Sequence, residues 1–360
     1  ITCNCLYRPG DYGSKFWRIP AILQLSDGTL LAVNDKRNET EEDLPGRIDV
    51  VCRYSTDKGK TWSDMQYVAK NTGFMHGYGD PGLAEFEDGT VICTFTSGET
   101  FSFSKWENPQ RSFYALSHDH GRSWEKPVEF TGVIWGPQAE NPSTSSCRSS
   151  FTSSGNSLVI KEGPYKGRFI AMAVLFNDAT GRLCNHAIFT DDGAKTWHVS
   201  DMVPAPCGDE AKVVQLNDGN LLCSIRNNGN RLWSISRDGG LHWEESREWA
   251  DVTTCACNGD LIRYNDRILL HSVPDSDRRE NVCVKVSYDD GKTWPVSKVI
   301  CKGPSQYSSL TVLQDGTIAA FIEKNTSGVE LWYLNFTLGW VEGKFYKKGV
   351  FIDRILDHVR

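Results

Sequence analysis

A short turn motif, Ser-x-Asp-x-Gly-x-(Thr/Ser)-Trp, recurs five times along this chain of 360 residues. The copies lie at Ser55–Trp62, Ser117–Trp124, Thr190–Trp197, Ser236–Trp243 and Ser287–Trp294. Two are looser, because the third has Ala194 where glycine is expected and the fourth has His242 in the Thr position. Each aspartate can accept backbone N–H groups, each glycine permits a left-handed backbone, and each Trp can pack beneath its turn. The five aspartates are therefore predicted to be structural.

A second element, apolar-x-Asp-Gly-x-apolar, leads into a β-rich run at each occurrence. Its copies are Leu25–Ala32, Phe86–Cys93, Leu216–Cys223 and Leu313–Ala320. The Asp-Gly step is typical of a β-hairpin, and helical periodicity is nearly absent from the chain. Turn motifs spaced by about 45–75 residues are typical of four-stranded blades. We therefore predict an all-β fold, a six-bladed β-propeller that forms one domain over residues 1–360, with functional residues from all blades meeting on its axis.

The charge balance limits the partners. The chain has 39 Lys and Arg against 46 Asp and Glu, a formal net charge of −7. This acidic excess disfavours a general binder of nucleic acid or of an anionic membrane, since both need a basic surface. No apolar run approaches the ~20 residues of a membrane span. We expect neither a nucleic-acid partner nor a membrane span.

Twelve cysteines leave two interpretations open. Those inside strand-like runs are typical of small buried apolar residues: Cys52, Cys93, Cys223 and Cys283. Cys3/Cys5 and Cys255/Cys257 form C-x-C pairs, and neither has the second pair or the histidines of a zinc site. Free buried thiols and some disulfides are both compatible with this pattern. Neither the cysteines nor the eight histidines indicate a metal site.

The turn motifs are similar to the Asp-boxes of sialidases, also called neuraminidases. The segment that begins at Phe16, FWRIPAILQLSDGTLLAVNDKRNETEEDLPGRIDV, resembles the opening of bacterial-type exo-α-sialidases, whose signature is the Arg-Ile-Pro of Arg18–Pro20. The two resemblances occur in order over nearly the whole chain. They imply a retaining glycoside hydrolase without a cofactor, which releases terminal sialic acid from sialylated glycans, glycoproteins or glycolipids.

The resemblance also implies the residues that bind the substrate. Arg18, Arg226 and Arg279 match three arginines that bind the carboxylate of sialic acid, and a guanidinium suits a carboxylate because it bonds it bidentately. Arg37 and Asp80 match positions expected to contact the amide and hydroxyl region of the sugar. An apolar wall for the N-acetyl methyl group is expected from Phe101, Phe103 and Trp106, at least one of which we expect to pack in a blade core.

Three further matches imply the catalytic residues. Tyr307, in QYSSL, matches the nucleophile, and a neutral phenol avoids the repulsion that a carboxylate nucleophile would meet at an anomeric carbon bearing a carboxylate. Its ordinary pKa near 10 requires a base, and Glu210 matches that partner. Asp43 matches the acid/base residue, for which we expect a pKa raised by burial and neighbours. Sialidases with a tyrosine nucleophile are a recognised exception to the two-carboxylate scheme of glycosidases.

Two other functions use much of the same sequence. The first is transfer of the sialyl group to another sugar, or intramolecularly to an anhydro product, which differs in how water is excluded from the intermediate. The second is a non-catalytic sialic-acid-binding propeller, which we would expect to lack Tyr307, Glu210 or Asp43. The substrate suggests a secreted or cell-surface location, and we expect a monomer.

Overall fold

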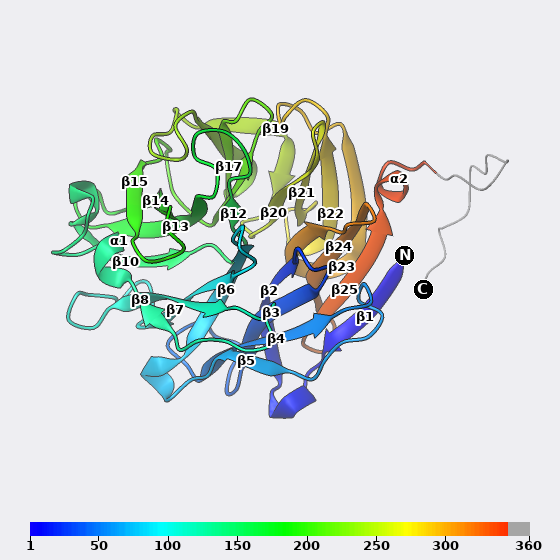
Figure 1. Ribbon diagram of the computed structural model, residues 1–360, viewed down its shortest axis with the longest axis horizontal. Coiled ribbons are helices and arrows are strands. Elements are labelled where there is room, and N and C mark those ends of the chain that lie inside the picture. Colours follow the sequence, from blue (N-terminus) through cyan, green and yellow to red (C-terminus); the bar gives the residue numbers. More distant parts are fainter. Residues whose placement is uncertain (345–360) are drawn as a thin grey trace.

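The computed structural model describes residues 1–344, which fold into mostly antiparallel sheets arranged around a central axis (Figure 1). The first sheet contains β2 (Phe16–Gln24), β3 (Leu30–Arg37), β4 (Ile48–Ser55) and β5 (Gln66–Ala69). The second contains β6 (Tyr78–Glu85), β7 (Val91–Gly98), β8 (Gln110–Ser117) and β9 (Val128–Glu129), with β11 (Gly155–Asn156) alongside β6. The third contains β10 (Cys147–Thr152), β13 (Phe169–Asn177), β14 (Arg182–Thr190) and β15 (His198–Met202), with β12 (Leu158–Val159) paired with β13. Each is a blade of a propeller.

The fourth sheet is β16 (Ala211–Gln215), β17 (Leu221–Ile225), β18 (Gly229–Ser236) and β19 (Arg247–Thr254). A seven-stranded sheet follows: β20 (Asp260–Asn265), β21 (Ile268–Pro274), β22 (Glu280–Ser287), β23 (Val296–Val312), β24 (Thr317–Asn325), β25 (Val329–Thr337) and β1 (Thr2–Tyr7). The first part of β23 pairs with β22 and its second part with β24, so this sheet divides into two four-stranded units. The blade count of six rests on this division.

Helices contribute little to the fold. The short α-helices are α1 (Thr131–Ile134) and α2 (Leu338–Val341), and the 3-10 turns are η1 (Asp11–Gly13), η2 (Phe74–His76) and η3 (Pro142–Thr144). Within residues 1–344, no helix has the length and apolar character needed to cross a membrane. The single domain expected over residues 1–360 includes residues 345–360, which lie outside the described residues.

The N-terminal strand closes the ring. β1 pairs with β25, so the first strand completes the last blade, and Figure 1 shows these strands side by side. Leu6 and Tyr7 of β1 pack in one buried cluster with Trp17 and Ile22 of β2 and with residues of β24 and β25. Apolar contacts of this kind between successive blades form the core, because both faces of each sheet are covered by its neighbours.

The turn motifs form the hydrogen-bonded turns that the sequence predicts. In the first copy, Asp57 accepts hydrogen bonds from the Thr61 backbone at 2.8 Å and hydroxyl at 2.7 Å, and from Ser55 at 2.8 Å. The third copy makes the same turn although Ala194 replaces the glycine, and Ala194 has a left-handed φ of 71°. The turn chemistry therefore tolerates the substitution at the cost of backbone strain.

The turns and the proposed site lie at opposite ends of the blades. In the first blade, Arg18 pairs with Asp35 at one end of the hairpin, whereas Gln24 pairs with Leu30 beside the Asp-Gly turn at the other. Leu30 in turn pairs with Ser55, where the first turn motif begins. The motif aspartate of this blade is therefore separated from Arg18 by the length of a strand. This placement agrees with the structural role expected for it.

All twelve cysteines are free thiols. Cys52, Cys93, Cys223 and Cys283 are buried inside strands, as their sequence context predicts. The sequence left free thiols and disulfides both open, and the structure contains free thiols.

Candidate active site

The β16–β17 hairpin brings Glu210 and Arg226 together. Glu210 directly precedes β16 and Arg226 directly follows β17, and Ala211 pairs with Ile225 between them. The backbone N–H of Arg226 donates to the carbonyl of Glu210 at 2.8 Å, and Arg226 Nη1 lies 2.6 Å from Glu210 Oε2. Two residues separated by a strand, a turn and a strand thus form a partly buried ion pair at one end of the blade.

Tyr307 of β23 completes this group. Its hydroxyl donates to Glu210 Oε2 at 2.6 Å and accepts from Arg226 Nη1 at 3.1 Å. The side chain is buried, with 8% of the residue exposed. Burial raises the pKa of Tyr307 well above its ordinary value, and the Glu210 carboxylate raises it further while Arg226 opposes the rise. The phenol is therefore neutral, and its proton already points at a carboxylate that can accept it.

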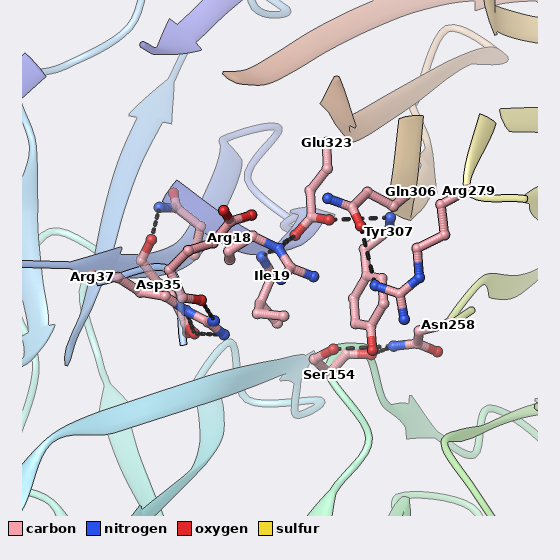
Figure 2. A network of polar contacts seen from close by, with 12 residues as sticks. Arg18, Ile19, Asp35, Arg37, Ser154, Asn258, Arg279, Gln306, Tyr307 and Glu323 are labelled. Carbon is pink, nitrogen blue, oxygen red and sulfur yellow. Dashed lines mark hydrogen bonds and ion pairs between the residues drawn. The ribbon is translucent and has the colours of Figure 1, made fainter. Parts of the chain in front are cut away.

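Arg18 and Arg279 lie on either side of the Tyr307 ring (Figure 2). Their guanidinium carbons are 5.4 Å and 5.5 Å from the ring centre. The structure thus brings together the three arginines that the sequence singled out, although they come from different blades. Their convergence gathers three guanidinium groups around one phenol, an arrangement suited to a single carboxylate, although Arg18 and Arg226 also pair with Glu323 and Glu210.

Glu323 is a residue of the site that sequence reasoning missed. Its carboxylate is fully buried and accepts from Arg18 Nε at 2.8 Å, from the Ile19 backbone at 2.6 Å and from the Tyr307 backbone at 3.3 Å. Ile19 has a left-handed φ of 62°, a strained conformation for a β-branched residue. Glu323 therefore fixes both the strained Arg-Ile-Pro segment and the tyrosine. Its one available signal was a glutamate inside the apolar strand β24.

Three of these residues lie at irregularities of inner strands. The register of β2 on β3 shifts between Arg18 and Ala21, and that of β23 on β24 shifts between Ser305 and Ser308, around Tyr307. The register of β6 on β7 shifts between Gly79 and Gly82, around Asp80. A bulge of this kind redirects a side chain from the sheet face. The regular parts of these strands form the sheets, and the polar side chains of the site lie at the register shifts.

Arg37 and Asp80 meet at a second carboxylate that the sequence did not reveal. The buried Asp35 accepts from Arg37 through Oδ2, at 3.2 Å from Nε and 3.1 Å from Nη2, and from the Asp80 backbone through Oδ1 at 3.0 Å. Burial raises the pKa of Asp80 well above its ordinary value, and the nearby carboxylates of Asp35 and Asp43 add to that rise. Asp35 thus links the two residues expected to face the sugar. Every residue of its strand β3 is buried, an unusual position for the polar run NDKR.

Asp43 departs from one expectation. It lies in the loop between β3 and β4, and its Oδ1 is 2.8 Å from Arg37 Nη2. Its side chain is 81% exposed, so the burial expected for an acid/base carboxyl is absent. The cause is its position on a surface loop, held from one side by the Arg37 guanidinium. Contact with Arg37 nevertheless places it at the site.

The three aromatic residues of the segment after β7 differ in their packing, and two of them pack against other aromatic rings. Phe103 is 73% exposed, whereas Trp106 packs edge-on against the buried Trp135 with ring centres 5.4 Å apart. Phe101 packs against Phe151, with ring centres 5.4 Å apart. Phe103 is the most exposed of the three, and Trp106 remains 39% exposed despite its contact with Trp135.

Arg279 also contacts two neighbours that sequence reasoning missed. Its Nη1 donates to the side-chain oxygen of Gln306 at 3.1 Å, and its Nη2 donates to the carbonyl of Ala256 at 3.3 Å. Within the described residues 1–344, no cluster of three or more His, Cys, Asp or Glu could hold a metal ion.

Comparisons with known proteins identify the family of the chain. The model of the BNR repeat-like domain matches residues 46–320. The chain belongs to this family. It is 32% identical over 361 residues to a sialidase from Micromonospora viridifaciens, a match that covers 93% of this chain and 53% of that protein. The chain therefore spans about half the length of that relative.

Solved structures of the family share the fold. The Hadza microbial sialidase Hz136 is 25% identical and superposes with a TM-score of 0.83, over 94% of this chain and 69% of that one. A leech intramolecular trans-sialidase, complexed with 2,7-anhydro-Neu5Ac, is 16% identical with a TM-score of 0.81, over 95% of this chain and 71% of that one. These likenesses establish a sialidase-type propeller for this member of the BNR repeat-like family.

Proposed function

We propose that this chain is an exo-α-sialidase that releases terminal sialic acid from sialylated glycans with retention of configuration. The observation that carries the proposal is the contact of Tyr307 with Glu210 and Arg226, flanked by Arg18 and Arg279. A buried phenol that donates to a carboxylate is an activated nucleophile, and the arginines supply the complement for the substrate carboxylate. The curated relatives with sialidase activity support it.

The residues divide the reaction into two steps. In the first, the Tyr307 oxygen attacks the anomeric carbon, Glu210 takes the phenol proton, and Asp43 gives a proton to the departing glycosidic oxygen. In the second, water attacks the anomeric carbon and the bond from that carbon to the Tyr307 oxygen breaks, while Asp43 takes a proton from the water and Glu210 returns its proton to the phenol oxygen. Arg18, Arg226 and Arg279 hold the substrate carboxylate throughout.

Hydrolysis is favoured over transfer by the exposure of Asp43. A carboxylate with 81% of its side chain exposed is accessible to water, which the second step consumes. Trans-sialylation and intramolecular transfer use the same nucleophile and differ in excluding water from the covalent intermediate. The leech neighbour shares the fold with this chain at 16% identity, and that likeness alone does not assign its reaction.

Product analysis tests both parts of the proposal. The protein is incubated with 2,3- and 2,6-sialyllactose, with and without excess lactose, and the products are separated by chromatography. Free sialic acid in both conditions supports hydrolysis, whereas a 2,7-anhydro product or a new sialoside identifies transfer. Binding without turnover would identify the non-catalytic propeller. Mass spectrometry of the Tyr307 peptide after reaction with 2,3-difluorosialic acid tests the covalent step, because that step requires an adduct on this tyrosine.

A further inference from the structure

Two thiols lie against the proposed nucleophile and have no role in the mechanism above. Cys255 and Cys257 belong to the loop between β19 and β20, and they form a small buried cluster with Ile19 and Tyr307. Cys255 is 7% exposed and Cys257 is fully buried. The pair therefore touches both the strained Arg-Ile-Pro segment and the tyrosine.

The two thiols are two residues apart and share one buried cluster. The neighbouring Cys257 thiol lowers the pKa of Cys255 to about 6, with help from Thr254 and the Arg279 guanidinium. Burial raises the pKa of Cys257. Cys255 is thus the sulfur that ionises more readily and Cys257 the one that stays protonated, which is the arrangement of a reactive cysteine with a resolving cysteine.

The backbone of this loop is held on both sides of its middle residue. The Cys255 N–H donates to the Ser276 carbonyl at 3.0 Å, and the Cys257 carbonyl accepts from Arg231 Nη1 at 3.0 Å. Between them, the Ala256 carbonyl accepts from Arg279 Nη2 at 3.3 Å. A change in the distance between the two sulfurs is therefore transmitted to Ala256, and through it to Arg279, which lies over the Tyr307 ring.

We propose that Cys255 and Cys257 form an oxidation site that closes to a disulfide in the presence of a hydroperoxide and reversibly disables the active site. The Cys255 thiolate attacks one oxygen of hydrogen peroxide, the O–O bond breaks, and with one proton taken up a water leaves, giving a sulfenic acid. The Cys257 sulfur then attacks the sulfenyl sulfur, the S–O bond breaks, and the hydroxyl leaves as water with the Cys257 proton. The two thiols lose two electrons and the peroxide gains them.

A second thiol pair of the chain provides a matched control. Cys147 and Cys184 also share a buried cluster, and the neighbouring Cys147 thiol lowers the pKa of Cys184 to about 5. That cluster lies between the blade of β6 and β7 and the blade of β13 and β14, and it does not include Tyr307. Asn185, next to Cys184, hydrogen-bonds to Asp209, next to Glu210, so Cys184→Ser measures any share of the inactivation that this pair contributes. Comparison of the two pairs therefore separates the effect of thiol reactivity from the effect of a position next to Tyr307.

The experiment treats the reduced protein with hydrogen peroxide and follows two readouts. Differential alkylation and mass spectrometry locate the disulfide, and turnover of a fluorogenic sialoside gives kcat and KM. We expect a Cys255–Cys257 disulfide and a fall in kcat/KM of roughly 100-fold, the order of loss that follows from a misplacement of about 1 Å. Dithiothreitol restores the rate. Cys255→Ser is insensitive to peroxide, whereas Cys184→Ser is inactivated like the unmodified protein.

Three results would overturn the proposal: no disulfide between these two cysteines, a disulfide with unchanged kcat/KM, or equal inactivation of Cys255→Ser and the unmodified protein. The mass-spectrometric arm uses the unmodified protein, so it decides the chemistry even where Cys255→Ser does not fold. The activity arm rests on the proposed sialidase function. If the reduced protein does not turn over the sialoside, the proposed function fails, while formation of the disulfide remains measurable on its own.

Discussion

The Tyr307 hydroxyl donates to Glu210 Oε2 across 2.6 Å, although 97 positions separate the two residues in the chain. The distance is short for an O–H···O contact to a carboxylate, which marks a strong, charge-assisted hydrogen bond. Arg226 Nη1 binds both oxygens and so fixes their relative position. Transfer of the phenol proton then requires no rearrangement of the protein, since donor and acceptor are already aligned.

Removing the Tyr307 hydroxyl is the direct test of the nucleophile. We expect Tyr307→Phe to lose several orders of magnitude in kcat on sialyllactose, because the ring still packs but no oxygen can attack. Tyr333→Phe is the control: this buried tyrosine donates to the Lys58 carbonyl at 3.0 Å, in the cluster that closes the ring. Initial-rate kinetics compare the two. Near-normal rates for Tyr307→Phe would remove the tyrosine from the mechanism.

Glu323 is expected to position Arg18. Glu323→Gln preserves the size of the side chain but weakens its hydrogen bond to Arg18 Nε, a contact to a charged group worth about 1.5–3 kcal/mol. We expect kcat/KM to fall by roughly 10- to 100-fold, mostly through KM, because in the proposed reaction the arginine binds the substrate carboxylate in the ground state as well. Steady-state kinetics compare Glu323→Gln in the unmodified protein with Glu323→Gln in the Arg18→Lys variant. In Arg18→Lys, the Glu323 substitution should reduce kcat/KM little further. An equal loss of kcat/KM in both proteins would contradict the role of Glu323 in positioning Arg18.

The first turn motif gives a pH dependence with a defined sign. Hydrogen bonds from the Thr61 hydroxyl and backbone and from Ser55 lower the pKa of Asp57 to about 2, below its ordinary value near 3.9. A carboxyl with a lowered folded-state pKa stabilises the fold above pH ~4, and this contribution is lost as the pH falls towards 2. We expect Asp57→Asn to lower the Tm at pH 7 and to flatten its fall between pH 4 and pH 2.

The control for this measurement is Asp64→Asn, a substitution at an exposed aspartate two residues beyond the same motif. Its Tm should follow that of the unmodified protein at every pH, as monitored by circular dichroism. If Asp57→Asn shows the same acid limb as the unmodified protein, the turn carboxylate is not a source of the pH dependence.

The sequence predicted the propeller because its repeated turns require strands on both sides. Local motifs and the resemblance also singled out the three arginines, Tyr307 and Glu210, which the structure brings together. Glu323 and Asp35 escaped because a single carboxylate in a buried strand forms no pattern, and the contact between Glu323 and Arg18 spans 305 positions. Contacts of this kind are known only once the three-dimensional structure places the first and last blades side by side. The expected burial of Asp43 was wrong because a short sequence motif does not indicate how exposed its loop is in the folded protein.

Strain in the third turn motif can be measured by two opposite substitutions. Ala194 has a φ of 71°, and a left-handed alanine costs roughly 1–2 kcal/mol. Ala194→Gly removes this strain, but it also loses a buried methyl worth about 0.8 kcal/mol and adds the backbone entropy of glycine, about 0.5–1 kcal/mol. We therefore expect the free energy of unfolding to change by less than about 1 kcal/mol.

The reverse substitution in the second motif should behave differently. Gly121 has a φ of 82°, and a Cβ there would lie 2.7 Å from a methyl carbon of Leu31. Gly121→Ala thus adds left-handed strain and a steric clash in the core together, for a loss of about 2 kcal/mol or more. Urea unfolding of both variants provides the comparison. Equal losses in the two variants would show that neighbouring packing, rather than backbone conformation, decides which residue each turn accepts.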